Sequence, residues 1–168
     1  MNFSPVPLSL VDPKFPLADR QAAGLRAAAS TIGQPLTFLN ASTDAELDAA
    51  LSALRQHPVT ALLLLGNPFF DTRRNKIIAF AAQQKLPAMY HFREYVVGGG
   101  LMSYGTSLGE AYREAGAYAA KILNGAKPSD LPVLQSTKFE LVINLRTAKS
   151  LGLTIPASFL SLADELID

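Results

Sequence analysis

Side chains that can bind or react with a small molecule gather in three short segments of this sequence. In an open α/β sheet, ligands bind beyond the carboxyl ends of the strands, in pockets with aromatic walls and a few placed polar groups. This pattern favours a binding cleft over a reaction centre. The alternative is that each phenylalanine packs over the end of the hydrophobic core and contacts no ligand. Each segment follows a predicted β-strand, and the members are Asn67, Phe69 and Phe70, then Tyr90, Phe92, Arg93, Glu94 and Tyr95, then Ser103 and Tyr104.

The patterns that catalytic chemistry requires are missing. The two histidines, His57 and His91, have no second histidine or cysteine at metal-ligand spacing. Ser103 lacks the flanking glycines of a nucleophile elbow. The sequence therefore predicts no metal, no cofactor and no enzyme. A small α/β enzyme that uses Glu94 or Asp71 with Ser103 is the alternative with the thinnest support.

Glycines 98–100 are the one stretch that resembles a phosphate-binding loop. Such loops bind anions through backbone N–H groups when a helix N-terminus follows. Here the strand-like segment 101–104 follows instead. We therefore interpret the glycines as a turn.

Composition excludes several classes of partner and location. The 168 residues contain 15 Lys+Arg and 14 Asp+Glu, a formal net charge of +1, so nothing favours nucleic acid or an anionic membrane. The sequence has no cysteine, which rules out disulfides and thiolate chemistry. Residues 1–8 lack the features of a secretory signal, and the longest apolar run, 59–66, is too short to span a bilayer. We expect a soluble chain, cytoplasmic if this is the whole product.

Short apolar runs alternate with helical periodicity, which is typical of βα units around a mostly parallel sheet. One predicted helix passes through Leu47, Leu51 and Leu54 and ends by His57–Pro58. The remaining helices are predicted at 17–32, 73–85, 108–123 and 145–151, with a last one starting near Pro156. Strands are predicted at 8–11, 36–39, 61–65, 86–90, 101–104 and 139–143.

Several element boundaries follow from local chemistry. Pro7 cannot donate to a strand ladder, so the first strand is expected to begin at Leu8. Residues 42–44 supply N-cap candidates, with Glu46 placed to complete a capping box. Asp71 or Thr72 is expected to cap the helix at 73–85, and Ser107 the helix at 108–123. Gly105 is expected to end the strand before Ser107.

The sequence resembles the substrate-binding proteins of ABC transporters, in particular the members that bind tryptophan and other aromatic amino acids. The resemblance runs from about Val11 to the C-terminus. It is carried by Gly66-Asn-Pro-Phe-Phe70, Leu86-Pro-Ala-Met-Tyr-His-Phe-Arg-Glu-Tyr95, Gly99-Gly-Leu-Met-Ser-Tyr-Gly105, Lys121-Ile-Leu-Asn-Gly-Ala-Lys-Pro128, Thr137-Lys-Phe-Glu-Leu-Val-Ile-Asn-Leu-Arg-Thr-Ala-Lys149 and Leu151-Gly-Leu-Thr-Ile-Pro156.

The resemblance implies the α/β fold of a type I periplasmic-binding protein, in which two Rossmann-like lobes close on a ligand. Each lobe is a parallel sheet flanked by helices. Only the C-terminal half of that fold is expected here, as residues 1–100 for the second lobe, 101–132 for a strand and helix returning to the missing first lobe, and 133–168 for the crossover back. Two positions depart from the family pattern, since Asp12-Pro13 replaces Asn-Pro and Asn67 stands where many relatives carry Asp.

The resemblance also implies a function without covalent chemistry. A truncated solute-binding component would hold an amino acid or a similar small organic ligand and deliver it to an ABC permease, in the periplasm where the family works. The roles expected of its residues are apolar walls for Phe69, Phe70 and Tyr90, hydrogen bonds for Asn67, Ser103 and Tyr104, and an ammonium partner for Glu94.

The helix at 108–123 leaves several interpretations open. Its apolar stripe would lack its usual sheet, and such a stripe must be buried against something. A homodimer that buries this stripe is the simplest solution. The chain could also be a folded remnant that binds nothing, or an interaction module that dimerises.

Overall fold

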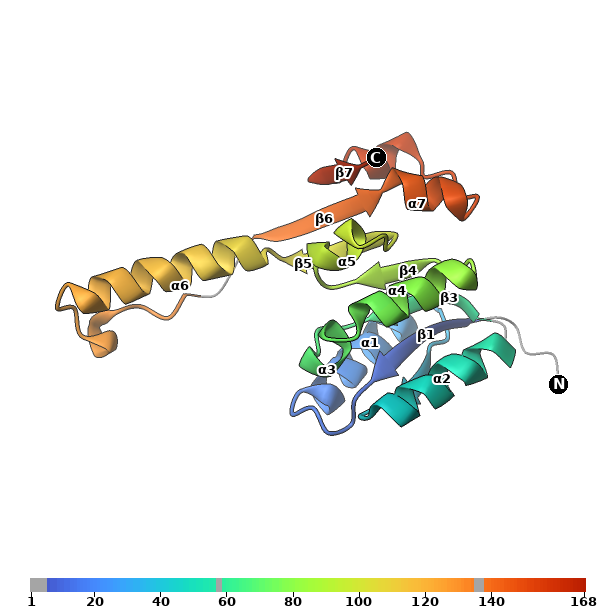
Figure 1. The fold of residues 1–168 in the computed structure, drawn as a ribbon, viewed down its shortest axis with the longest axis horizontal. Coiled ribbons are helices and arrows are strands. Elements are labelled where there is room, and N and C mark those ends of the chain that lie inside the picture. Colours follow the sequence, from blue (N-terminus) through green and yellow to red (C-terminus); the bar gives the residue numbers. More distant parts are fainter. Residues whose placement is uncertain (1–5, 57–58, 135–137) are drawn as a thin grey trace.

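One sheet organises the residues that the computed structural model describes, which are 6–56, 59–134 and 138–168 (Figure 1). Its seven strands lie in the order β2-β1-β3-β4-β5-β6-β7. All neighbouring strands pair in parallel except β5 and β6, which are antiparallel. The strands are β1 (Val6–Val11), β2 (Thr37–Asn40), β3 (Val59–Leu64), β4 (Ala88–Tyr90), β5 (Met102–Thr106), β6 (Phe139–Asn144) and β7 (Glu165–Ile167).

Helices connect the strands and cover the sheet. Figure 1 shows α1 behind β1, while α2 and α4 lie in front of the sheet. This agrees with right-handed crossovers, because the chain moves outward from β1 to β2 and then reverses direction across the sheet. The helices are α1 (Ala18–Thr31), α2 (Asp44–Gln56), α3 (Pro68–Asp71), α4 (Arg74–Gln83), α5 (Arg93–Val97), α6 (Leu108–Leu123), the 3₁₀ turn η1 (Pro128–Asp130), α7 (Leu145–Ser150) and α8 (Ala157–Leu160).

The main core lies between the sheet and the α2–α4 layer. Leu62 and Leu64 occupy alternate positions of β3 and therefore point to the same face of the sheet, the face covered by α2 and α4. They are 1% and 0% exposed. Burial of such side chains drives the fold, at roughly 25 cal/mol for each Å² of apolar surface removed from water. The cluster includes Leu8 and Leu10 of β1, Leu47, Leu51 and Leu54 of α2, and Ile77, Ile78 and Phe80 of α4.

The α/β class and two predicted helix starts are confirmed. The Thr43 hydroxyl accepts the Glu46 N–H at 3.2 Å, and the Glu46 carboxylate reaches back to the Ser42 N–H at 2.7 Å. Ser107 caps α6, since its side-chain oxygen accepts the Glu110 N–H. These interactions are local, which is why the sequence pattern is sufficient to predict them.

Two predicted boundaries at the ends of strands are wrong. Strand β1 begins at Val6 and includes Pro7. The pairing with β3 shifts register between Val6 and Leu8, so the strand accommodates a proline that has no N–H to donate. Strand β5 continues through Gly105 to Thr106. A Cβ at Gly105 would lie 1.9 Å from the carbonyl oxygen of His91, so glycine lets the two segments approach closely. The predicted helix end at His57–Pro58 lies outside the described residues.

Two predicted helices also differ from the structure. Neither Asp71 nor Thr72 caps α4, whose N-cap is Arg73 without a side-chain hydrogen bond, because α3 intervenes. The last helix is the single turn α8, and the sequence did not predict the strand β7 that follows it. The sheet itself continues past residue 100, since β5 pairs with β4.

Helix α6 stands apart from the rest of the chain. Figure 1 shows strands β5 and β6 leaving the sheet side by side as a ribbon, with α6 projecting from its tip. None of the sixteen residues of α6 is buried. The segment that returns toward β6 contacts one side of the helix, where the Tyr118 hydroxyl donates to the Pro132 carbonyl at 2.7 Å.

We predict that Gly105→Ala destabilises the fold by about 3 kcal/mol, because the new methyl group collides with backbone rather than with a flexible side chain. Gly24→Ala is the matched control, since a Cβ there meets nothing within 4 Å and alanine is the better helix former. Urea denaturation of both variants measures the effect. Equal midpoints for the two variants would contradict the close approach of β5 to His91.

Candidate ligand-binding site

Polar residues follow the carboxyl ends of four neighbouring strands. Asp12 follows β1, Ser42 comes shortly after β2, Asn67 lies three residues beyond β3, and His91 follows β4 directly. Because these strands are parallel, their carboxyl ends meet at one edge of the sheet. This edge is where an open α/β sheet binds ligands.

Asp12 joins the ends of three strands. Its carboxylate accepts the Ser42 hydroxyl, the Lys14 backbone N–H at 2.9 Å and the Asn67 amide at 3.4 Å. Partial burial acts to raise the pKa of Asp12, but the hydrogen bonds together outweigh it and leave the pKa below its ordinary value. Asp12 therefore stays ionised and holds the loops together.

Asn67 starts the short helix α3. Its side-chain oxygen accepts the N–H of Phe69 at 2.7 Å and the N–H of Phe70 at 3.4 Å, as an N-cap does. Its amide nitrogen faces Asp12, which fixes the orientation of the side chain. With 3% of its surface exposed, Asn67 supports the edge from within.

Asp71 links α3 to the segment after β4. Its carboxylate accepts the Tyr95 hydroxyl at 2.9 Å, and the same oxygen lies 2.9 Å from Nε2 of His91. The His91 contact is a close approach without an aligned hydrogen bond, since neither ring nitrogen has an aligned partner among the described residues. Burial, followed by the nearby Asp71 charge, raises the pKa of Tyr95.

Phe69 and Arg73 form the outer wall of the α3 loop. The Arg73 guanidinium lies 3.9 Å from the centre of the Phe69 ring, a cation–π contact. Arg73 also pairs with Asp44 through two bonds of 2.6 and 2.9 Å. The Phe69 ring is partly exposed at this edge.

Four of the seven predicted binding residues support the edge from inside the protein. Tyr90 stacks on Tyr95 with ring centres 4.6 Å apart. Phe70 and Tyr90 belong to the main core, where they present almost no surface to a ligand, and their role as ligand walls stays a prediction. The exposed fractions are 3% for Asn67 and 1% each for Phe70, Tyr90 and Ser103.

The other three predicted residues present surface. Phe69 is partly exposed, and the Glu94 carboxylate is exposed and makes no hydrogen bond or ion pair with the described residues. Tyr104 is 53% exposed and stacks on the equally exposed Phe139 of the neighbouring strand, with ring centres 5.7 Å apart. The accessible surface therefore combines aromatic rings with an unpaired carboxylate.

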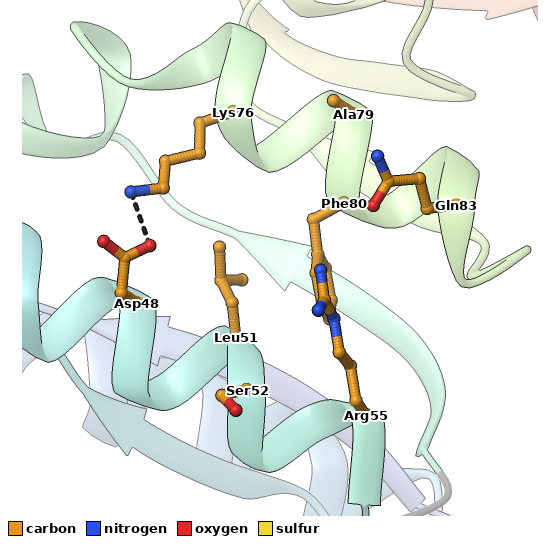
Figure 2. A pocket seen from close by; sticks show the side chains of 8 residues that line it. All are labelled: Asp48, Leu51, Ser52, Arg55, Lys76, Ala79, Phe80 and Gln83. Carbon is orange, nitrogen blue, oxygen red and sulfur yellow. Dashed lines mark ion pairs between the residues drawn. The ribbon is translucent and has the colours of Figure 1, made fainter.

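The structure also contains hollows that none of the seven predicted binding residues lines. One hollow of about 270 Å³ lies between α2 and α4. Figure 2 shows the Lys76–Asp48 ion pair that bridges it and Arg55 beside Phe80. It lies within the helical layer, where polar side chains of both helices stand over the core residues Leu51 and Phe80, so we interpret it as a surface trough. A second hollow of about 430 Å³ lies at the start of α6, where Arg93 is held by Glu165 at 2.5 Å.

Sequence patterns alone did not identify Asp12 and Ser42 as members of the site. The available signal was the one that identified Asn67, a polar residue just after a predicted strand and followed by proline, which Asp12 also has. The role of Asp71 was also misjudged. Its partners, Tyr95 and His91, lie more than fifteen residues away in the sequence, so only the fold reveals them.

We predict that Asp12→Asn lowers stability at neutral pH by about 1–3 kcal/mol, because three donors lose a charged acceptor. A carboxyl group with a lowered pKa stabilises the fold above its unfolded pKa of about 3.9, and this contribution is lost as pH falls through the folded value. Thermal denaturation of both proteins at pH 7 and at strongly acidic pH should therefore show a gap that closes in acid. A gap that persists unchanged in acid would contradict the prediction.

We predict opposite outcomes for two tyrosines in the same stack. Tyr90→Phe should be neutral or stabilising, because the buried Tyr90 hydroxyl has no hydrogen-bond partner among the described residues. Tyr95→Phe should cost about 1 kcal/mol, since it removes the bond to Asp71. The midpoints of urea denaturation of the two variants, each compared with the unmodified protein, measure these effects. Equal losses would show that Tyr90 has a partner.

Two properties of the described residues bear on membranes and metals. No helix in that part of the chain is both long and apolar enough to cross a membrane. Within the same residues, no three His, Asp or Glu side chains gather as metal ligands would.

Solved structures share this fold. A conserved domain protein from Vibrio cholerae matches with a TM-score of 0.83 and 25% identity, over 96% of this chain and 54% of its own. A Streptococcus pneumoniae ABC domain in complex with L-Trp matches with a TM-score of 0.85 and 23% identity, over 97% of this chain and 56% of its own. A ligand-free, open substrate-binding protein with adhesive properties from Clostridium difficile matches with a TM-score of 0.67 and 21% identity, over 97% and 54%.

The chain therefore spans little more than half the length of these structures. No match is found among curated protein sequences. A model of the family described as ABC transporter substrate binding protein matches residues 9–167. Together with the lobe-like fold, this match shows that the chain belongs to the ABC transporter substrate-binding protein family.

Proposed function

We propose that this chain is one lobe of a substrate-binding protein and holds a small organic solute, such as an amino acid, at the carboxyl edge of its sheet. The observation that carries the proposal is the edge itself, where Phe69, Tyr104 and Glu94 present accessible aromatic and anionic surface on a rigid support. Its fold is similar to that of a domain in complex with L-Trp, which supports the ligand class.

The charges at the edge favour a ligand with a cationic group. Glu94 is exposed without an ion pair among the described residues, whereas the nearby Arg93 is already held by Glu165. The carboxylates of Asp12 and Asp71 add negative charge to the same edge of the sheet. Glu94 would bind the ammonium of the solute, while the Phe69 and Tyr104 rings would pack against its apolar part.

The mechanism is differential affinity between open and closed states, without covalent chemistry. In this proposal residues 1–100 form the ligand-binding lobe, 101–132 reach toward a second lobe, and 133–168 cross back. The second lobe would supply the facing wall of the cleft and, together with this lobe, dock on an ABC permease. The family belongs to the periplasm or the cell exterior, where the complete clamp would work.

Ligand binding stabilises the folded state by RT ln(1 + [L]/Kd), so a thermal shift tests the proposal. We predict that L-tryptophan or another amino acid at about ten times its Kd raises the melting temperature of the chain by about 3–6 °C. Glu94→Gln should weaken the Kd about tenfold or more, because it removes the charge that the ammonium meets.

Glu114→Gln is the matched control for Glu94→Gln, because it makes the same change on an exposed residue of α6, away from the edge. It should leave the shift unchanged. The absence of a shift with every amino acid at saturating concentration would overturn ligand binding by this chain. That result would favour a folded remnant that binds nothing. Equal loss in both variants would remove the role of Glu94.

A further inference from the structure

The backbone of Phe69 is held on both sides of the residue. Its N–H donates to the Asn67 side-chain oxygen at 2.7 Å. Its carbonyl oxygen accepts the Thr72 hydroxyl at 2.9 Å and an N–H of the Arg73 guanidinium at 3.1 Å. The two peptide groups that flank the Phe69 side chain are therefore fixed, although α3 has only four residues.

The Phe69 ring is held as well as the backbone. The Arg73 guanidinium lies 3.9 Å from the ring centre and covers one face of the ring. Phe70, which is 1% exposed, meets the ring with the two centres 5.3 Å apart and the planes at 64°. Phe69 still keeps part of its surface exposed. A ligand would therefore meet the part of the ring that these two neighbours leave uncovered.

Arg73 covers the ring because its guanidinium is itself fixed. Two of its nitrogens donate to the two carboxylate oxygens of Asp44 at 2.6 and 2.9 Å, a two-point contact that sets the plane of the group. The third nitrogen donates to the Phe69 carbonyl and to the Thr72 hydroxyl. The hydrogen bond from Arg73 lowers the pKa of Asp44, so the carboxylate stays charged. With every guanidinium nitrogen bonded within the protein, Arg73 is suited to hold Phe69 rather than to bind an anionic ligand.

The same ion pair contributes little to the stability of the fold. The Arg73 and Asp44 side chains are 28% and 64% exposed, and water screens ion pairs at such positions. A second ion pair, between Lys76 and Asp48 at 2.5 Å, joins α2 and α4 about one helical turn further along. The two helices are therefore tied without Arg73, whereas Arg73 is the cation that lies over Phe69.

We propose that Arg73, held by Asp44, is a positioning residue of the ligand-binding edge and fixes the Phe69 ring in the orientation that a solute meets. The inference rests on the proposed function, in which the Phe69 ring packs against the apolar part of the solute. A wall that is already fixed binds more tightly, because less side-chain freedom is lost when the ligand arrives. Arg73 and Asp44 act through Phe69 and do not touch the solute.

A fluorescent side chain at position 69 tests the hold on the ring without any ligand. The chain has no tryptophan, so Phe69→Trp introduces a single indole without background. Adding Arg73→Gln should raise acrylamide quenching of this indole about twofold, because one face of the ring loses its cover. Lys76→Gln is the matched control, since it removes the neighbouring ion pair between α2 and α4, and it should leave the quenching unchanged.

Two further variants separate positioning from a general loss of structure. Asp44→Asn keeps Arg73 but removes its charged partner, and it should raise the quenching as Arg73→Gln does. Arg73→Lys keeps the positive charge but lacks the planar fork, so it should not restore the protection of the indole. Combining Arg73→Gln with Asp44→Asn should add no further quenching, because both act on the same ring. The urea midpoints of these variants should stay close to that of their Phe69→Trp parent.

Binding of L-tryptophan to chains that keep Phe69 is the second measurement. Arg73→Gln and Asp44→Asn should each weaken the Kd from isothermal titration about fivefold, because the ring must then be ordered on binding. Lys76→Gln should leave the Kd unchanged. Since Phe69 is intact here, this measurement tests the inference even where Phe69→Trp fails to fold.

The outcomes distinguish this inference from the proposed function. Unchanged quenching in Arg73→Gln would overturn the positioning role, whether or not the chain binds a ligand. Raised quenching with an unchanged Kd for L-tryptophan would also overturn it, because the orientation of Phe69 would then not matter to the solute. Raised quenching in Arg73→Gln and Asp44→Asn, with no amino acid bound by the unmodified chain, would refute the proposed function and confirm that this pair fixes the ring.

Discussion

Parallel pairing of β2, β1, β3, β4 and β5 is the constraint on which the rest of the molecule depends. It brings five carboxyl ends to one edge, and it forces every connection to cross a face of the sheet as a helix. The strands therefore need apolar residues toward the helical layer, which the Leu62 and Leu64 side chains supply. The segments at the carboxyl edge bury some residues, such as Phe70, but leave others, such as Glu94, at the surface, where their side chains are accessible.

The edge shows how a lobe can be rigid and still carry accessible polar groups. Asp12 and Asp71 use their carboxylates to hold other parts of the protein, one tying strand ends together and the other holding Tyr95. Glu94 is left with an exposed side chain on α5, the helix that Asp71 holds through Tyr95, and Tyr104 is exposed on the neighbouring strand β5. Such a division is expected of a binding surface, since contacts with a ligand are strong only where the contacting groups are already held in place.

The sequence predicted what local chemistry determines. The Ser107 cap and the Thr43–Glu46 box each depend on residues within one helical turn, and both are predictable from the sequence alone. Strand β7 and the inclusion of Pro7 in β1 depend on pairing with distant segments, so no local pattern contains them. The role of the seven predicted site residues in binding stays a prediction, and the burial of Phe70, Tyr90 and Ser103 follows from tertiary packing, which no local pattern contains.

The β5–β6 ribbon determines how the edge and α6 relate to each other. Antiparallel pairing of five residue pairs makes the ribbon stiff, and stacking of Tyr104 on Phe139 stiffens it further. Because Ser107 is the only residue between β5 and α6, the helix extends directly from the end of the ribbon. Tyr104 lies on that same ribbon and on the accessible part of the edge. Whatever covers α6 is therefore joined to Tyr104 through one short antiparallel ribbon, which is the structural connection between the helix and this edge of the sheet.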